Sequence, residues 1–251
     1  MSTVQEHYDR HLGPVYAWMA GGIEPALERG AAELDAIGAH ASPGAIALDL
    51  GAGFGMHAIP LARRGFDVLA IDSSAVMLHE LSRQADAVSV RAVCGDLLSF
   101  PQHLSIRPEL VLCMGDTLTH LPDEESVERL IAAVAESLGE GGRFVITLRD
   151  YSAPLTGPQR FIPVRSDENR IFVCFLEYTA TRVTVTDILH QRDGSEWKMS
   201  ASTYDKLRIT PEWLDDRLRR SGFAVTRDIN ASGMLRFVAA KPVRARPASA
   251  R

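Results

Sequence analysis

The sequence predicts an α/β protein built on a doubly wound, mostly parallel sheet, and three observations lead to this fold class. Short apolar runs alternate with segments of helical periodicity between residues 45 and 150, as in successive βαβ units. A glycine-rich turn follows the first apolar run. The chain has 251 residues, of which 46% are hydrophobic and 24% charged. That composition suits one large domain with an embellishment and a sizeable core.

The expected core lies between residues 45 and 150, where apolar strands end in a turn or an acidic residue. Its predicted elements, in chain order, are strand 45–50, helix 54–64, strand 66–72, helix 74–85, strand 87–96, strand 109–116, helix 123–138 and strand 142–150. Helices between consecutive strands act as crossovers, so the sheet should be mostly parallel.

The segments that flank this core have different patterns. Residues 1–44 have helical spacing broken at glycine and proline, and they predict an N-terminal helical lid. Residues 151–209 are rich in β-branched and aromatic residues, which predicts an antiparallel β insertion that shapes a substrate pocket or a dimer interface. Residues 210–241 should complete the core with a helix and a hairpin whose last strand is antiparallel, and residues 242–251 should be a disordered tail.

Composition and charge exclude several classes of function. The net charge is −5 and no basic run precedes the tail, so no nucleic-acid partner is expected. No apolar run is long enough to span a membrane, and the polar N-terminus has no signal-peptide pattern. Three cysteines without a CxxC pair and eight histidines without metal-ligand spacing predict a reducing, cytoplasmic location and no metal.

The turn after the first predicted strand reads DLGAGFG, in which Asp49, Gly51, Gly53 and Gly55 stand at alternate positions. Glycines at such a turn let the backbone approach a ligand closely. The dinucleotide fingerprint G-x-G-x-x-G grips a pyrophosphate, but here the third glycine comes one residue early. Asp49 would repel a pyrophosphate and attract an amino group. The turn therefore favours a ligand with a cationic end.

This turn resembles motif I of the class I S-adenosyl-L-methionine (SAM)-dependent methyltransferases, and residues 45–150 resemble their Rossmann-like SAM-binding core. The resemblance implies that Asp72 binds the ribose hydroxyls and that Asp96 and the Leu97 N–H face the adenine. An NAD enzyme would use Asp72 in a similar way, so this acid alone does not discriminate. The implied binding residues for SAM, and for its product S-adenosyl-L-homocysteine (SAH), are Asp49, Gly51, Ala52, Gly53, Gly55, Asp72, Ser73, Met77, Gly95, Asp96, Leu97, Met114, Gly115 and Thr117.

Three further segments resemble the glycine/sarcosine type of small-molecule N-methyltransferase. GDTLTHL is similar to that group's G-N-S-x-x-H-L, with Asp116 in place of the amide. LRDYS is similar to H-R-N-Y-D and makes Arg149 the residue that binds a substrate carboxylate, while STYDKL is similar to S-Y-Y-P-H-x-L. His120 and Tyr204 are the catalytic candidates, and the implied substrate-binding residues are Tyr8, Tyr16, Trp18, Asp116, His120, Arg149, Tyr151 and Tyr204.

Each of these side chains also has a purely structural interpretation. Arg149 could pair with Asp150 at the surface, and His120 could orient its own loop. Tyr204 could pack within the sheet, and the N-terminal aromatic residues could pack between helices. The sequence leaves these alternatives open.

The sequence therefore predicts a SAM-dependent methyltransferase that acts on a small molecule as a monomer or homodimer. N-methylation of an amine or amino acid with an anionic group is the favoured reaction. O-methylation of a hydroxyl or carboxyl group is one alternative. A protein that binds SAM or NAD without catalysis is another.

Overall fold

A computed structural model describes residues 3–85 and 88–243. Its helical elements are α1 (Val4–His7), η1 (Tyr8–Leu12), α2 (Gly13–Met19), α3 (Ile23–Ala36), α4 (Ala58–Arg63), α5 (Ala75–Gln84), η2 (Leu97–His103), η3 (Thr117–His120), α6 (Glu124–Ser137), η4 (Gly157–Arg160) and α7 (Pro211–Arg220). Its strands are β1 (Ile46–Leu50), β2 (Asp67–Asp72), β3 (Val90–Cys94), β4 (Leu110–Cys113), β5 (Arg143–Leu148), β6 (Phe161–Ser166), β7 (Arg170–Tyr178), β8 (Arg182–Asp193), β9 (Glu196–Leu207), β10 (Ala224–Ile229) and β11 (Leu235–Ala240).

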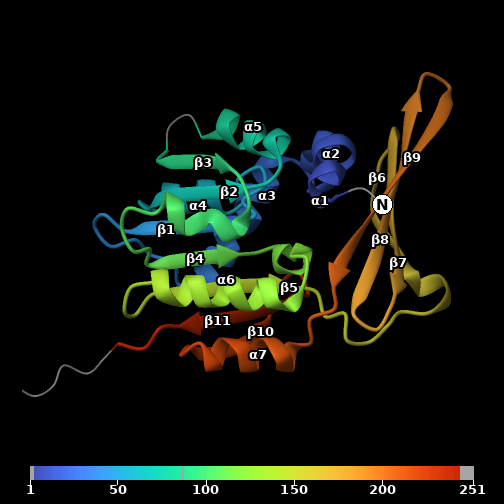
Figure 1. The fold of residues 1–251 in the computed structure, drawn as a ribbon. Coiled ribbons are helices and arrows are strands. Elements are labelled where there is room, and N and C mark those ends of the chain that lie inside the picture. The colour runs from blue at the N-terminus through green and yellow to red at the C-terminus, as the bar shows by residue number, and fades with distance from the viewer. Residues whose placement is uncertain (1–2, 86–87, 244–251) are drawn as a thin grey trace, which may run out of the picture.

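The core is a seven-stranded sheet with the order β10-β11-β5-β4-β1-β2-β3 (Figure 1). Strands β1 to β5 pair in parallel, and β11 pairs antiparallel with both β5 and β10. Chain order reverses at β1, whose neighbours are β2 and β4. In such sheets a ligand binds beyond the carboxyl ends of the strands at this reversal. The predicted α/β sheet with an antiparallel closing strand is confirmed.

Helices cover both faces of this sheet because each has one apolar stripe. Helix α6 begins after Asp123, whose carboxylate accepts a hydrogen bond from the Ser126 N–H, and it buries Leu130 and Ile131 against the core. Helices α3, α4 and α5 pack on the opposite face through residues that include Leu34 and Leu81. The helix predicted over residues 54–64 is shorter in the structure. Helix α4 begins only at Ala58, because glycines with left-handed backbone angles occupy the preceding turn.

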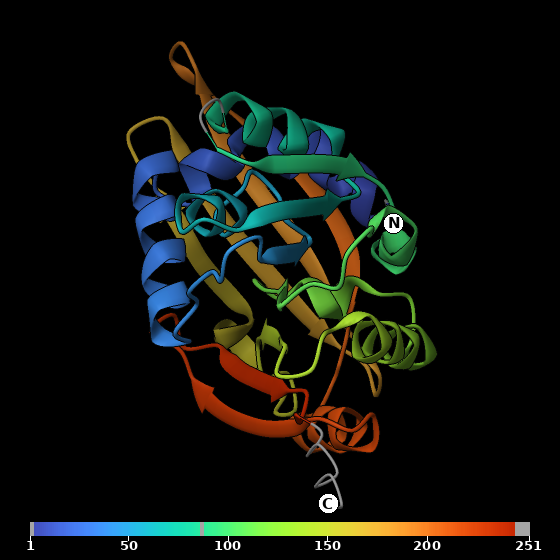
Figure 2. The same ribbon diagram turned by 90° about the vertical axis from the view of Figure 1, so that its left-hand side faces the viewer.

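The insertion after β5 folds as a four-stranded antiparallel sheet in the order β6-β7-β8-β9, which confirms the expected architecture. Figure 2 shows this sheet behind the core, with the N-terminal helices packed against it. Leu12 and Val15 of those helices pack with Phe172 and Leu189 of the sheet. The N-terminal lid is therefore enclosed between the core and the insertion.

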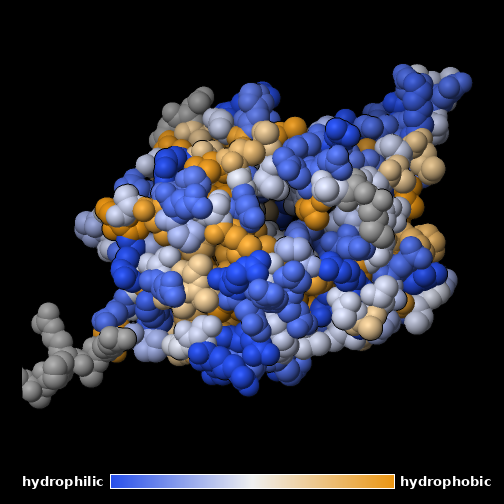
Figure 3. All heavy atoms as spheres, in the orientation of Figure 1, coloured by the Kyte–Doolittle hydropathy of each residue, from blue (hydrophilic) through white to orange (hydrophobic). Residues whose placement is uncertain are grey.

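The remaining expectations on domain organisation stay predictions. The tail predicted at 242–251 lies, from residue 244 on, outside the described residues. Among the described residues, no helix combines the length and hydropathy that a membrane crossing requires. The turn of the β8–β9 hairpin projects beyond the rest of the insertion, and its tip is hydrophilic (Figure 3).

Candidate active site

The glycine turn after β1 forms a cradle in which Gly51 has no room for a side chain. The N–H groups of Gly51 and Ala52 donate to the Ile71 carbonyl at 2.8 and 3.1 Å, which ties the turn to β2. Gly51 has φ +76°, in the left-handed region. A Cβ on Gly51 would lie 2.3 Å from Cγ2 of Thr117. The Thr117 side chain is itself fixed, since its hydroxyl donates to the Met114 carbonyl at 2.7 Å.

Substituting this glycine should disrupt the cradle. We expect Gly51→Ala to lower the free energy of unfolding by about 2 kcal/mol, because it adds a left-handed backbone penalty to a steric clash. Gly53→Ala should cost less, since its Cβ would meet only the flexible end of Met77, at 3.2 Å. Urea unfolding of both variants measures the difference. Equal losses would contradict the steric argument.

Asp72 ends β2 at the edge of the cradle. Its two carboxylate oxygens accept hydrogen bonds from the N–H groups of Gly53 and Ser74, each at 2.8 Å. Burial raises the pKa of Asp72, and these hydrogen bonds oppose the shift. A carboxylate oxygen can accept more than one hydrogen bond, so both oxygens can still accept from a pair of ligand hydroxyls.

Asp49 lies beneath the same turn and is 1% exposed. One of its oxygens, Oδ2, is buried and has no hydrogen-bond partner in the structure. Burial raises the pKa of Asp49 to about 6. A buried carboxylate with an unpartnered oxygen suits a cationic ligand. The turn, Asp72 and Asp49 together fit the ribose and the amino-acid end of SAM.

A cavity joins this cradle to the N-terminal helices, and a hollow opens near the centre of the face in Figure 3. The predicted residues that line it are Tyr8, Tyr16, Gly51, Ala52, Gly53, Asp72, Ser73, Met77, Leu97, Met114, Gly115, Thr117 and His120. Residues from the lid, the glycine turn and the ends of β2 and β4 therefore meet in one place.

An aromatic cluster closes the end of the cavity beneath the lid. The His120 ring centroid lies 5.7 Å from that of Tyr8 and 5.5 Å from that of Tyr204. Burial raises the pKa values of Tyr8, Tyr16 and Tyr204 above their usual value, so all three are neutral phenols at neutral pH. Burial also lowers the pKa of His120 to about 3, so its ring is neutral too.

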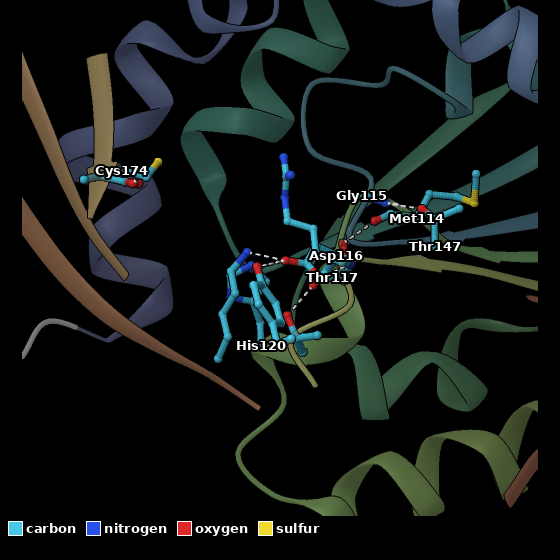
Figure 4. Close-up of polar contacts among 12 residues, drawn as sticks. Met114, Gly115, Asp116, Thr117, His120, Thr147 and Cys174 are labelled. Carbon is cyan, nitrogen blue, oxygen red and sulfur yellow. Dashed lines mark hydrogen bonds and ion pairs between the residues drawn. The ribbon is translucent and has the colours of Figure 1, made fainter. Parts of the chain in front are cut away.

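The carboxylate of Asp116 accepts hydrogen bonds from three donors of the protein itself. Asp116 lies just beyond β4 with φ +75°, where a non-glycine residue is uncommon. Its carboxylate accepts from the Arg149 N–H at 3.0 Å, the Tyr151 hydroxyl at 2.8 Å and the Lys206 ammonium at 2.6 Å. In Figure 4, Asp116 and His120 lie close together and Cys174 lies apart on the insertion. Asp116 therefore ties the core sheet to the end of β9.

Arg149 follows directly after β5 and does not line the cavity. Its side chain is exposed and makes no hydrogen bond or ion pair with any described residue. Burial raises the pKa values of Tyr16 and Tyr151, and the positive charge of Arg149 opposes both shifts. The guanidinium therefore faces the same region as these phenols and is available for an anionic group.

Comparison with known proteins agrees with this geometry. Residues 47–142 match the family described as "Methyltransferase domain". The chain is 33% identical over 107 residues to a glycine/sarcosine N-methyltransferase of Aphanothece halophytica, an alignment that covers 41% of this chain and 40% of that relative. Residues 47–142 are therefore similar to a methyltransferase domain. The chain matches about two fifths of the length of such curated relatives.

Two solved methyltransferase structures share the fold of this chain along nearly its whole length. The methyltransferase CcbJ of Streptomyces caelestis is 21% identical, with a TM-score of 0.78 over 97% of this chain and 100% of CcbJ. The amino pentose methyltransferase CalS10 of Micromonospora echinaspora, solved with SAM bound, is also 21% identical. Its TM-score is 0.71 over 90% of this chain and 95% of CalS10.

The other predicted residues lie outside the lining of the cavity. Gly55 packs where a Cβ would meet Ile59, and the Gly95 N–H donates to the Asp72 carbonyl at 2.9 Å. Asp96 is exposed and accepts a hydrogen bond from the N–H of Leu98 at 2.9 Å. The Trp18 indole donates to Asp167 on the insertion. The remaining predicted residues that do not line the cavity are Asp49, Asp116, Arg149, Tyr151 and Tyr204.

Sequence reasoning missed several residues at this site. Lys206 was not predicted, although it follows Tyr204 by two residues on a strand and therefore shares its face. Phe54, Met56 and His57 line the cavity but carry no motif assignment. His57 stands two residues after the last glycine of the turn, so its position in the sequence could have indicated that it lies at the cavity.

Proposed function

We propose that this chain is a SAM-dependent enzyme that methylates a nitrogen atom of a small amine or amino acid carrying an anionic group. The single observation that carries the proposal is the joined cavity. It connects the SAM-type glycine cradle with Tyr8, Tyr16 and His120 of the aromatic cluster. The exposed Arg149, whose charge acts on Tyr16, lies nearby. The similarity to glycine/sarcosine N-methyltransferases supports nitrogen as the acceptor.

The residues of the cradle suit successive groups of the cofactor along the cavity. Asp72 would bind the ribose hydroxyls, and Leu97 and Met77 would contact the adenine. Asp49 would attract the amino group, since its Oδ2 has no partner in the structure. SAM supplies an electrophilic methyl group, and the protein contributes mainly proximity and alignment.

The aromatic cluster would orient the attacking nitrogen. Nδ1 of His120 is buried and has no hydrogen-bond partner among the described residues, while Nε2 lies 3.4 Å from the Tyr8 hydroxyl. A neutral imidazole nitrogen or a phenol oxygen can accept a hydrogen bond from an amine N–H. Such acceptors would hold the nitrogen lone pair toward the methyl group. Arg149 would bind the anionic end in a bidentate pair.

This arrangement favours nitrogen over a hydroxyl group as the acceptor. A neutral amine attacks through its own lone pair, whereas a hydroxyl group needs a base to remove its proton. His120 has a pKa of about 3 and the nearby tyrosines are protonated phenols, so none of them is a strong base. The geometry therefore supports N-methylation more than O-methylation of a hydroxyl.

Methyl transfer from isotopically labelled SAM tests the proposal. The purified protein would be incubated with amines, amino acids, amino sugars and matched hydroxy acids, and the products identified by mass spectrometry. Label on the nitrogen of an anionic amine supports the proposal. Transfer only to oxygen, or binding of NAD but not of SAM or SAH, would overturn it.

Arg149 gives a test of the substrate class. We expect Arg149→Ala to raise KM for an anionic amine about 10- to 100-fold, the loss typical of a charge-assisted pair, with a smaller effect on kcat. Arg149→Lys should recover only part of this, because an ammonium lacks the planar fork. Arg63→Ala, which removes an exposed arginine at the end of α4, is the matched control. An unchanged KM in Arg149→Ala would show that Arg149 does not bind the anionic end of the substrate.

A further inference from the structure

His57 lies at one end of the cofactor cavity and has no role in the function proposed above. It lines the cavity immediately before α4 and is 8% exposed. Its Nε2 lies 2.8 Å from Oε2 of Glu33 on α3. Among the described residues Nδ1 has no hydrogen-bond partner, and it is not among the buried unpartnered atoms. One ring nitrogen is therefore held by the protein, and the other is open to the cavity.

The surrounding structure fixes the orientation of this ring. A Cβ on Gly30 of α3 would lie 1.9 Å from the Met56 carbonyl oxygen, so α3 approaches the turn closely only because residue 30 is glycine. That approach places Glu33, one turn further along α3, against His57. Glu33 is held from its other side by the Asn230 amide, at 3.3 Å. This second contact gives the carboxylate one preferred position.

His57 also neighbours the unpartnered acid. Burial raises the pKa of Asp49, and the nearby His57 opposes that shift, so the two side chains lie close enough to interact beside the glycine turn. Asp49 offers an acceptor there, and His57 offers a donor when both of its nitrogens carry protons. An α-amino acid group carries an ammonium and a carboxylate on one carbon. An adjacent acceptor and donor match that pair of charges.

We infer that His57 binds the carboxylate of the amino-acid end of the cofactor and that Glu33 is the positioning residue that holds its ring. The inference rests on the proposed function, because it requires a SAM-type cofactor. Asp49 would bind the ammonium beside it. The protein should then bind a ligand that has the carboxylate more tightly than one that lacks only this group, and the difference should depend on His57.

Calorimetric binding of SAM and of decarboxylated SAM, which keeps the amine but lacks the carboxylate, tests the inference without turnover. Wild-type protein should bind SAM about 10- to 100-fold more tightly than the decarboxylated compound, the size of one charge-assisted hydrogen bond. In His57→Ala this preference should fall to about 2-fold or less, through weaker SAM binding alone. Glu33→Gln should reduce the preference partly, because it keeps an acceptor but loses the charge.

Controls separate a binding role from a structural one. His57→Gln preserves side-chain bulk before α4 if the alanine variant unfolds, and it should also lose most of the preference. His40→Ala removes an exposed histidine and should leave both affinities unchanged. If the His57 variants lost affinity for both ligands equally, or for neither, the inference would be wrong and the proposed function would stand. Failure of the wild-type protein to bind SAM would overturn the proposed function and this inference with it.

Discussion

Lys206→Met should lower the free energy of unfolding by about 3–5 kcal/mol, because it leaves the buried carboxylate of Asp116 without its charged partner. The Lys206 and Asp116 side chains are 10% and 4% exposed, and the ammonium lies 2.6 Å from Oδ2. The Tyr151 hydroxyl and the Arg149 N–H would remain as donors, but neither carries a balancing charge. Urea unfolding followed by circular dichroism measures the loss.

The double substitution Asp116→Asn with Lys206→Met provides the decisive comparison. It removes both charges, and an asparagine oxygen can still accept the two remaining hydrogen bonds, so the double variant should be more stable than Lys206→Met alone. Lys198→Met removes an exposed lysine on the same strand, paired with Asp193, and should cost less than about 1 kcal/mol. The Asp116→Asn variant completes the set. If the loss of stability in the double variant equalled the sum of the losses in Lys206→Met and Asp116→Asn, the two charges would not interact.

The core was predictable because its signals are local. Alternating strands and helices, the glycine turn after β1 and the acid that ends β2 each occupy a few consecutive residues, and together they predicted the α/β sheet and the cofactor cradle. The spacing of Asp49 and the three glycines favours a SAM-type turn over a dinucleotide turn.

The wall of the substrate site was less predictable because its contacts join residues distant in the chain. The hydrogen bond between Lys206 and Asp116 spans 90 positions, and the contact between Tyr8 and His120 spans 112. Asp116 was predicted to contact substrate, whereas its carboxylate is held by protein donors in the structure. Motif comparison could place Asp116 at a strand end, but only the packing of β9 against η3 could show its partner.

Asp49→Asn should change stability and cofactor affinity in opposite directions. The folded-state pKa of about 6 lies above the ordinary value of 3.8, so the protonated acid is favoured in the folded protein. The stability that this proton contributes is fully present below the pKa of the unfolded chain. It is lost as the pH rises through the pKa of the folded protein. Asparagine is neutral at every pH and can still accept the Ala58 N–H. Without ligand, the variant should therefore be more stable by about 2–3 kcal/mol at pH 8.

The pH dependence identifies the cause of this stabilisation. The difference in unfolding free energy between variant and wild type should grow as the pH rises from about 4 to 6, and it should stay level above about pH 7. Glu136→Gln neutralises an exposed acid on α6 and should show no comparable gain.

Affinity should respond in the opposite sense, since only ionised Asp49 attracts the amino group of the cofactor. Wild-type protein should bind SAH less tightly as the pH falls below about 6, whereas Asp49→Asn should bind it at least about 10-fold more weakly and without this pH dependence. A variant that gains stability and keeps its affinity would show that Asp49 is only a buried acid of the core. A variant that loses both would show that the carboxylate stabilises the turn without ligand. Only a gain in stability with a loss of affinity fits a buried acid that the fold retains, at a cost, to bind its ligand.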